Sequence, residues 1–171
     1  MATATLESRG MENTFSEAHG TMQLVSFQLG KEFYGIEITK VREIILIAEI
    51  TRIPETPHYL KGLINLRSTV IPVIDLRARF GLPETELTDE SRIMVLQASG
   101  KTIGIVVDAV SEVLRVKRDQ IAPPPPTVAG LGRDYLNGLV KLDDRLLILL
   151  EIDKIFSAEE VNALENASAG T

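Results

Sequence analysis

The sequence contains no cysteine and only two histidines. The absence of cysteine excludes disulfides, thiol catalysis and cysteine-based zinc sites, and it suits a reducing cytoplasm. His19 and His58 have no partner at the spacing typical of metal ligands. Glycine-rich phosphate loops, nucleophile elbows and zinc-protease helices are also missing. The sequence therefore predicts no catalytic residue, no metal site and no cofactor.

Basic charge and long apolar runs are lacking as well. The formal net charge is −6, which argues against general nucleic-acid binding, because that function needs a basic face. No run of about 18 apolar residues occurs, so no membrane insertion is expected. The first twenty residues have no apolar core of a signal peptide. The chain is predicted to be cytoplasmic.

What the chain does contain is an internal repeat. Residues 35–45 resemble residues 104–114 without gaps, and residues 59–76 resemble residues 135–152. The spacing between the two copies changes only in the intervening loop, where insertions are best tolerated. A repeat should be recognised before other structure is assigned. We interpret the chain as a duplication of one β unit.

Each copy consists of short apolar segments separated by turn signals, without an amphipathic helix of ten or more residues. This pattern is typical of small sandwiches or barrels. The sequence predicts a mainly β domain over residues 21–166, built of two intertwined barrels over roughly 35–90 and 91–150 that terminal segments complete. Short helices are expected between strands, with a C-terminal helix from residue 152. Residues 1–20 are predicted to be a disordered leader, and residues 167–171 are expected to fray.

The most informative stretch is the predicted hairpin from Gly62 to Leu76, with Ser68 and Thr69 as turn residues. Arg67 interrupts its apolar arms. It is either an exposed charge or the ion-pair partner of Glu43. An exposed ion pair contributes roughly 0 to 1 kcal/mol, whereas an arginine framed by aliphatic residues is well suited to anchor a partner. Recognition is the better explanation of Arg67.

Several carboxylates allow a competing hypothesis. Asp75, Asp108 or Asp143 could serve a metal-dependent enzyme. However, Asp143-Asp144 is the repeat counterpart of Arg67-Ser68, which indicates a hairpin turn. Asp75 and Glu151 match each other across the repeat and end a strand before a helical turn, a place typical of helix caps; Asp108 has the same interpretation. The enzyme stays open as an alternative.

Three motifs in order carry a family resemblance. They are Lys61-Gly62-Leu63-Ile64-Asn65-Leu66-Arg67, Val70-Ile71-Pro72-Val73-Ile74-Asp75-Leu76 and Gly104-Ile105-Val106-Val107-Asp108. Together they resemble the CheW family of bacterial chemotaxis coupling proteins, over roughly residues 22–164. The resemblance implies two SH3-like five-stranded β-barrels. It also implies a non-enzymatic adaptor that couples methyl-accepting chemoreceptors to the regulatory domain of the histidine kinase CheA. The length favours a stand-alone adaptor over a kinase or a receiver-domain fusion.

The resemblance also implies binding residues, partners and a location. Receptor binding would use a groove between the barrels, held by aliphatic anchors and a few polar groups. Kinase binding is assigned to the proline-rich segment, which could equally be a spacer. Recruitment to membrane-associated receptor arrays and ring contacts with further copies of the chain are implied as well. An adaptor of another kinase pathway, in motility or development, remains an alternative. The receptor-binding residues would be Val41, Glu43, Gly62, Asn65, Leu66 and Arg67, and the kinase-binding residues Ile121, Pro123, Pro126 and Thr127.

One residue departs from the family pattern. Ser68 stands where the family usually has glycine. A glycine at that place suggests a backbone with positive φ, which other residues rarely adopt. The geometry of this turn is therefore an open question for the structure.

Overall fold

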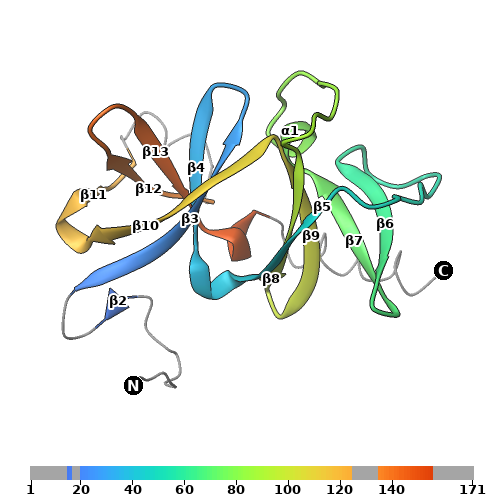
Figure 1. Ribbon diagram of the computed structural model, residues 1–171, viewed down its shortest axis with the longest axis horizontal. Helices are drawn as coiled ribbons and strands as arrows, with labels where there is room; N and C mark the ends of the chain where they lie inside the picture. Colours follow the sequence, from blue (N-terminus) through green and yellow to red (C-terminus); the bar gives the residue numbers. More distant parts are fainter. Residues whose placement is uncertain (1–14, 17–19, 125–134, 156–171) are drawn as a thin grey trace.

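The structure is a computed structural model that describes residues 15–16, 20–124 and 135–155. It is almost entirely β (Figure 1). No helix in these ranges is long and apolar enough to cross a membrane. The strands are β2 Phe15–Ser16, β3 Thr21–Leu29, β4 Glu32–Glu37, β5 Val41–Leu46, β6 Leu60–Leu66, β7 Thr69–Asp75, β8 Arg92–Ala98, β9 Lys101–Val107, β10 Ala109–Lys117, β11 Ile121–Ala122, β12 Leu136–Lys141 and β13 Leu146–Leu150. The helices are α1 Leu76–Arg79 and the 3₁₀ turns η1 Ile38–Lys40, η2 Arg118–Gln120 and η3 Ile152–Lys154.

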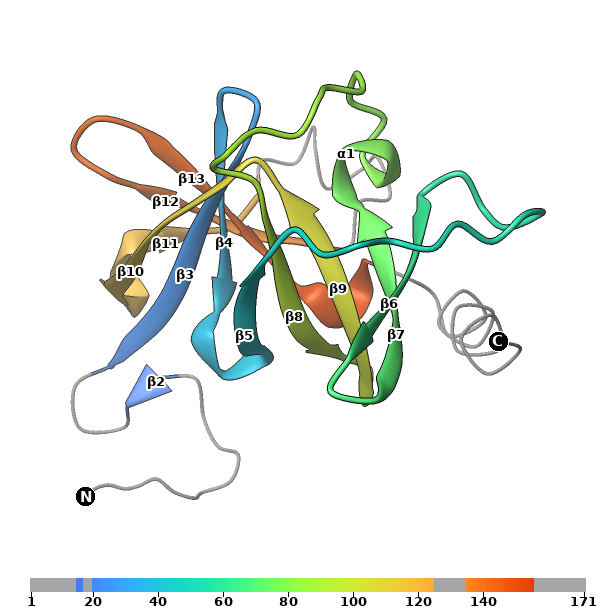
Figure 2. The same cartoon turned by 45° about the vertical axis from the view of Figure 1, so that its right-hand side comes forward.

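The strands form two sheets. One has five strands in the order β5-β8-β9-β7-β6, and the other has the order β10-β3-β4-β13-β12-β11, with β2 added beside β3. Thr51, after β5, bridges to Leu63 of β6, so the two edges of the five-stranded sheet meet. In the other sheet, β11 follows β10 through η2 and pairs with β12 at the opposite edge. Each sheet thus curls into a barrel, and Figure 2 shows the two barrels side by side.

The sheets show how the two copies of the repeat are intertwined. The hairpin β3–β4 corresponds to β8–β9, β5 to β10, and β6–β7 to β12–β13. Each copy gives its first hairpin to the barrel built by the other copy: β8–β9 pair with β5 and β7, while β3–β4 pair with β10 and β13. The parallel pairs match as well, Val73 with Gly104 and Leu149 with Gly35. The chain crosses between barrels at η1 and at Asp108.

The largest apolar cluster lies where the barrels meet. It combines Phe27 and Ile36 of one sheet with Ile74, Met94 and Ile105 of the other, all nearly inaccessible to solvent. Each barrel also has a smaller core of its own. Burying these side chains supplies the main stabilisation, at roughly 25 cal/mol per Å² of apolar surface. The two barrels therefore depend on each other, as the small size of the repeat unit suggests.

Several expectations need correction or lie outside the described residues. The barrels do not divide between residues 90 and 91, because β8 and β9 belong to the sheet of β5, β6 and β7. The expected leader contains β2, which pairs with the start of β3. The second sheet exceeds five strands because the two-residue strands β2 and β11 join it. Where the C-terminal helix is expected, the structure describes only the 3₁₀ turn η3, so that helix is not confirmed. Residues 156–171, including the expected frayed end, lie outside the described ranges.

Candidate partner-binding groove

The turn between β6 and β7 has a fixed and unusual backbone. Leu66 pairs with Thr69, which leaves Arg67 and Ser68 as a two-residue turn, one residue earlier than the expected Ser68-Thr69. Both have positive φ, 48° and 68°. Positive φ at both central residues is the signature of a type I′ hairpin turn, whose twist matches that of the flanking strands. The family's glycine position is thus a left-handed position here, occupied by a serine.

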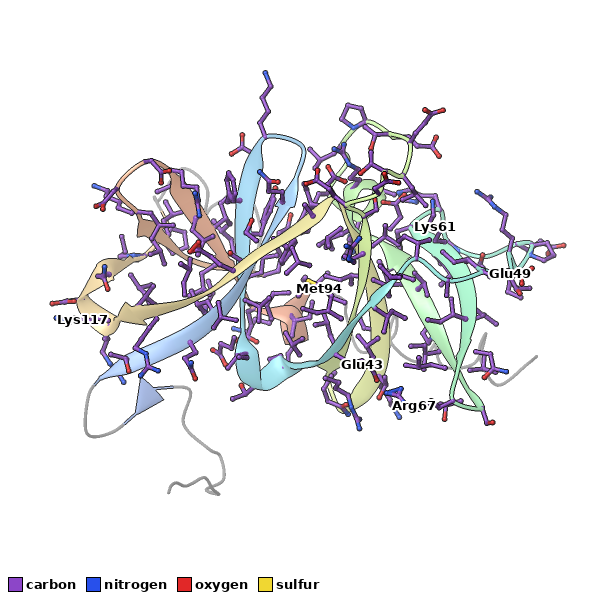
Figure 3. All side chains as sticks on the ribbon, viewed as in Figure 1. Glu43, Glu49, Lys61, Arg67, Met94 and Lys117 are labelled. Carbon is purple, nitrogen blue, oxygen red and sulfur yellow. The ribbon has the colours of Figure 1, made fainter. Side chains whose placement is uncertain are left out.

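This turn aims Arg67 at Glu43 on β5. The Arg67 Nη2 to Glu43 Oε2 distance is 2.6 Å, and Nη1 lies 2.9 Å from Oε2 and 3.2 Å from Oε1. The open choice between a lone charge and an ion pair is settled for the ion pair (Figure 3). The Arg67 side chain remains 67% exposed, so most of its surface is accessible to a partner.

The ion pair forms one wall of a hollow of about 370 Å³ at the end of the first barrel. Its floor comes from Ile71 and Val95, and its rim from Thr69 and Thr102. Leu66 adds a half-buried apolar side chain to the lining. Apolar side chains next to a fixed pair of charges are typical of a surface that binds another protein. We call the hollow the groove. Ile44 and Leu46 lie on the opposite face of β5 from Glu43 and are 40% and 68% exposed.

The predicted receptor-binding residues do not all reach the groove. Glu43, Leu66 and Arg67 line it. Val41 lies two residues before Glu43 on the same strand and packs partly against the shared core. Asn65 is exposed on β6, opposite Val70. Gly62 is buried in the barrel wall, and a Cβ there would collide with the Thr51 carbonyl oxygen; its role is to let the chain after β5 approach β6.

Of the predicted kinase-binding residues, two are described. Ile121 lies in β11 and packs partly against the core of the second barrel, and Pro123 is exposed just beyond it. Pro126 and Thr127 lie outside the described residues. The part of this segment that the structure describes therefore begins inside the barrel wall and leads outward.

The carboxylates of the enzyme hypothesis have structural partners. The Asp75 side chain accepts a hydrogen bond from the Ala78 backbone and caps α1, as predicted, whereas Glu151 makes no such bond at η3. Asp143 is exposed in the β12–β13 turn. Asp108 pairs with Arg77 rather than capping a helix. Within the described ranges, no group of three acidic or histidine side chains is arranged to hold a metal.

Beside the groove, the crossover from β4 to β5 is held by the second barrel. We call Lys40, Ser99 and Asp153 the Asp153 cluster. Lys40 Nζ lies 2.6 Å from Asp153 Oδ2, and the Ser99 backbone donates to Asp153 Oδ1 at 2.7 Å. Burial alone would raise the pKa of Asp153, but these two hydrogen bonds and the lysine charge lower it below its ordinary value. The bond to Asp153 in turn raises the pKa of Lys40.

A third charged group, Glu37, faces this cluster. Glu37, the last residue of β4, is half-buried near Glu151, Lys40 and Asp153. Burial and the negative charge of Glu151 raise its pKa to about 7, although Lys40 partly opposes the shift. The carboxyl group of Glu37 at the crossover therefore changes its charge near neutral pH.

Sequence reasoning missed the part of the groove that β8 and β9 supply. Arg42 donates to Gln97 at 2.9 Å and lies 3.5 Å from Thr102, and Val95 forms part of the floor. Val95, Gln97 and Thr102 come from the second copy of the repeat, whereas Arg42 comes from the first. Only the exchange of hairpins brings them together, and the strand pattern carries no signal for that exchange.

Comparison with known proteins agrees with this fold. The family model described as the CheW-like domain matches residues 23–160. The chain is 40% identical over 146 residues to the chemotaxis protein CheW of Klebsiella aerogenes, covering 85% of this chain and 88% of that one. It is 38% identical to the CheW of Treponema pallidum, with coverage of 84% and 87%.

A solved structure is similar too. The crystal structure of the scaffolding protein TtCheW from Thermoanaerobacter tengcongensis matches with a TM-score of 0.72 and 37% sequence identity, over 81% of this chain and 94% of that one. Matches in sequence and in fold thus extend over nearly the whole described chain, including the groove. The chain belongs to the CheW family of chemotaxis adaptor proteins.

Proposed function

We propose that this protein is a non-enzymatic scaffold that couples methyl-accepting chemoreceptors to the histidine kinase CheA in cytoplasmic signalling arrays. The observation that carries the proposal is the groove. A type I′ turn holds Arg67 over Glu43, and most of the arginine surface stays exposed. An exposed ion pair adds little to stability, so its fixed geometry is better explained by recognition.

The groove suits the cytoplasmic tip of a receptor, which we take to be helical. A helix that lies in a groove is held by apolar anchors at helical spacing and oriented by a few polar groups. Leu66, Ile71 and Val95 line the groove with apolar atoms, and the free edge of the Arg67 guanidinium offers donors in a planar fork. A carboxylate on the receptor helix is the natural partner for those donors.

The kinase would bind elsewhere. We assign it to the segment that begins at Ile121 and Pro123 on the second barrel, away from Arg67. Separate surfaces allow one molecule to hold both partners at once, as a coupling protein requires. Contacts with further copies of the chain would then extend the array into rings.

The charge reversal Arg67→Glu tests the receptor assignment. We expect loss of co-sedimentation with receptor-containing membranes, because the variant places two carboxylates together and removes the donor fork. The circular dichroism spectrum and melting temperature should change little, since an exposed pair contributes at most about 1 kcal/mol. Binding of CheA, measured separately by pull-down, should persist.

The repeat supplies a matched control. Asp143 is the counterpart of Arg67 in the β12–β13 turn and is also exposed. Asp143→Lys changes the net charge by the same amount in the opposite direction, and receptor binding should survive it. Retained receptor binding by Arg67→Glu, or equal loss in both variants, would refute the site.

A further inference from the structure

Two clusters tie the barrels together at equivalent places in the repeat. The Asp153 cluster has a counterpart formed by Gly30, Arg77 and Asp108, which we call the Asp108 cluster. In it, Asp108 Oδ2 lies 2.6 Å from Arg77 Nη2 and accepts the Gly30 backbone N–H at 2.6 Å. Gly30 and Ser99 occupy the same place in their hairpins, as do Arg77 and Asp153 after theirs. Each cluster thus links a hairpin turn, a carboxylate and a cation.

The two clusters are built with opposite charges. In the Asp153 cluster the crossover supplies the cation, Lys40, and the turn after β13 supplies the carboxylate. In the Asp108 cluster the crossover supplies the carboxylate and α1, after β7, supplies the cation. Both copies therefore have an ion pair between the barrels, although the positions of the cation and the carboxylate are swapped. This indicates that an ion pair between the barrels is needed at both places.

Of the two clusters, the Asp153 cluster lies at the end of the first barrel that carries the groove. Lys40 directly precedes Val41, the first residue of β5, and Ser99 lies in the β8–β9 turn between Gln97 and Thr102. These two segments carry Glu43, Val95 and Thr102 into the groove. Asp108 and Arg77 follow the opposite ends of β9 and β7. In Figure 2 the β8–β9 and β6–β7 turns lie at the lower end of the first barrel, and α1 lies at its upper end.

We infer that Asp153 is a positioning residue for the groove. From the second barrel, its Oδ2 holds the start of β5 through Lys40, and its Oδ1 holds the β8–β9 turn through Ser99. Ser99 Oγ adds a bond to the Asp153 carbonyl at 3.2 Å. Pairing of β5 with β8 sets the spacing of these strands, with Glu43 opposite Val95. The Asp153 carboxylate adds a brace at the end of this pair, where it holds the start of β5 and the β8–β9 turn to the second barrel. Asp153 touches no groove ligand itself.

Ser99 adopts an unfavourable backbone conformation at its contact with Asp153. Its φ is 50°, a left-handed conformation that costs a non-glycine residue roughly 1 kcal/mol or more. The N–H of a residue in that conformation points where Asp153 can accept it. A glycine would adopt this backbone conformation at lower cost, but it would lack the Ser99 hydroxyl, which donates the second hydrogen bond to Asp153 in η3. Both the backbone conformation and the hydroxyl of Ser99 therefore favour the contact between the β8–β9 turn and Asp153 of the second barrel.

Amide hydrogen exchange on the full-length protein tests the inference without any ligand. In Asp153→Ala, exchange over residues 41–46 and 97–103 should accelerate roughly tenfold or more, which corresponds to about 1.4 kcal/mol of local stability. Asp108→Ala, which removes the same kinds of contact from the Asp108 cluster, should leave both segments unchanged. Unaltered exchange in Asp153→Ala, or the same pattern in both variants, would overturn the positioning role.

Milder variants separate the two arms of the contact. Asp153→Asn keeps an oxygen for the Ser99 N–H but loses the ion pair, so residues 41–46 should exchange faster while residues 97–103 remain protected. The exchange Lys40→Asp with Asp153→Lys restores an ion pair but cannot accept from Ser99, so the pattern should reverse. Both variants retain part of the link, which keeps the test decisive if Asp153→Ala fails to fold.

The binding arm rests on the proposed function. Affinity for a receptor-tip fragment should fall roughly tenfold in Asp153→Ala and stay unchanged in Asp108→Ala, while affinity for CheA stays constant in both. If the native protein fails to bind the fragment, the proposed function is wrong, and the exchange data still decide the role of Asp153. Equal loss of receptor and CheA affinity would show a general structural defect and refute a positioning role.

Discussion

The hairpins β6–β7 and β12–β13 share a frame but differ in what they present. In both, a residue at the end of the second strand or directly after it donates its backbone N–H to a tyrosine carbonyl at 2.8 Å, Asp75 to Tyr59 and Glu151 to Tyr135. Gly62 and Gly138 lie at equivalent places and let a neighbouring segment come close. These shared residues build the barrels.

The charges at the turns are not shared. Arg67 on the first hairpin meets Glu43, whereas the counterparts in the second copy are Asp143 and Glu112, two residues of the same sign. Glu112 is instead held through its backbone, which exchanges two hydrogen bonds with the buried Ser26 hydroxyl. The duplication therefore preserved the scaffold and made a charged groove in one copy only.

The largest effect should come from adding a methyl group at the shared glycines. At Gly62, with φ of 153°, a Cβ would collide with the Thr51 carbonyl oxygen and approach Ile50 Cγ2 to 2.6 Å. At Gly138 the nearest atoms would be Ile121 Cγ2 at 2.9 Å and the Ala122 oxygen at 3.0 Å. Gly62→Ala should cost about 3 kcal/mol or more and Gly138→Ala about 1 to 2 kcal/mol. Urea denaturation of both variants measures the difference.

The reason for the unequal cost is how closely fixed backbone is met. At Gly62 the nearest atom is the Thr51 carbonyl oxygen, and Thr51 is held by its two hydrogen bonds to Leu63. At Gly138 the backbone oxygen of Ala122 is farther away, and the nearest atom belongs to the Ile121 side chain, which can shift. Equal destabilisation at Gly62 and Gly138 would mean that the second barrel is packed as tightly as the first. That result would contradict the expected difference in packing between the two hairpins.

The shared frame was readable from the sequence because it repeats. Strands, turns, the α1 cap at Asp75 and the shared apolar interface all follow from apolar spacing and breaker residues. The division at residue 90 was wrong because sequence order does not reveal which barrel receives a hairpin. Pairing of β8 with β5 is decided by the packing of the two cores, a long-range effect.

A medium effect is expected at the crossover. Glu37 has Val106 as its repeat counterpart, and Val106 is buried. The pKa of Glu37 in the folded protein, about 7, lies above its ordinary value of 4.5. Its stabilising contribution is therefore complete below pH 4.5 and is lost as the pH rises through 7. Between pH 5 and 8 the native protein should lose about 1 kcal/mol, after allowance for partial exposure.

The variant Glu37→Val removes this titration. Its melting temperature should be higher than that of the native protein by about 2 to 4 °C at pH 8 and should vary less between pH 5 and 8. Asp108 and Asp153 have lowered pKa values, so their contributions are lost only in more acidic solution and do not disturb this range. An unchanged pH slope in Glu37→Val would assign the slope to another group.

The groove was only partly predictable. Arg67 could be named because an arginine in an apolar hairpin is conspicuous, and Glu43 could be named as its ion-pair partner. Leu66, Gly62 and Asn65 were implied by the family resemblance, yet Gly62 is buried and Asn65 lies on a different face from Leu66. Strand residues alternate between faces, so neighbours in sequence do not share a surface. Asp153 could not be found, because its contacts span 113 and 54 residues of sequence.

The smallest effect distinguishes the two turns themselves. Ser68 has φ of 68°, whereas its counterpart Asp144 is not among the described residues with positive φ. Ser68→Gly removes a left-handed penalty of roughly 1 to 2 kcal/mol but adds flexibility to the unfolded chain worth roughly 0.5 to 1 kcal/mol. The net stabilisation should be about 0.5 kcal/mol, measurable by urea denaturation.

Asp144→Gly should have the opposite sign. No left-handed strain is relieved there, so only the entropic cost of glycine remains, and stability should fall by roughly 0.5 to 1 kcal/mol. Ser68→Gly should also leave receptor binding intact, because the type I′ backbone that aims Arg67 at Glu43 is the one that glycine favours. Stabilisation combined with weaker receptor binding would show instead that the Ser68 side chain itself meets the partner.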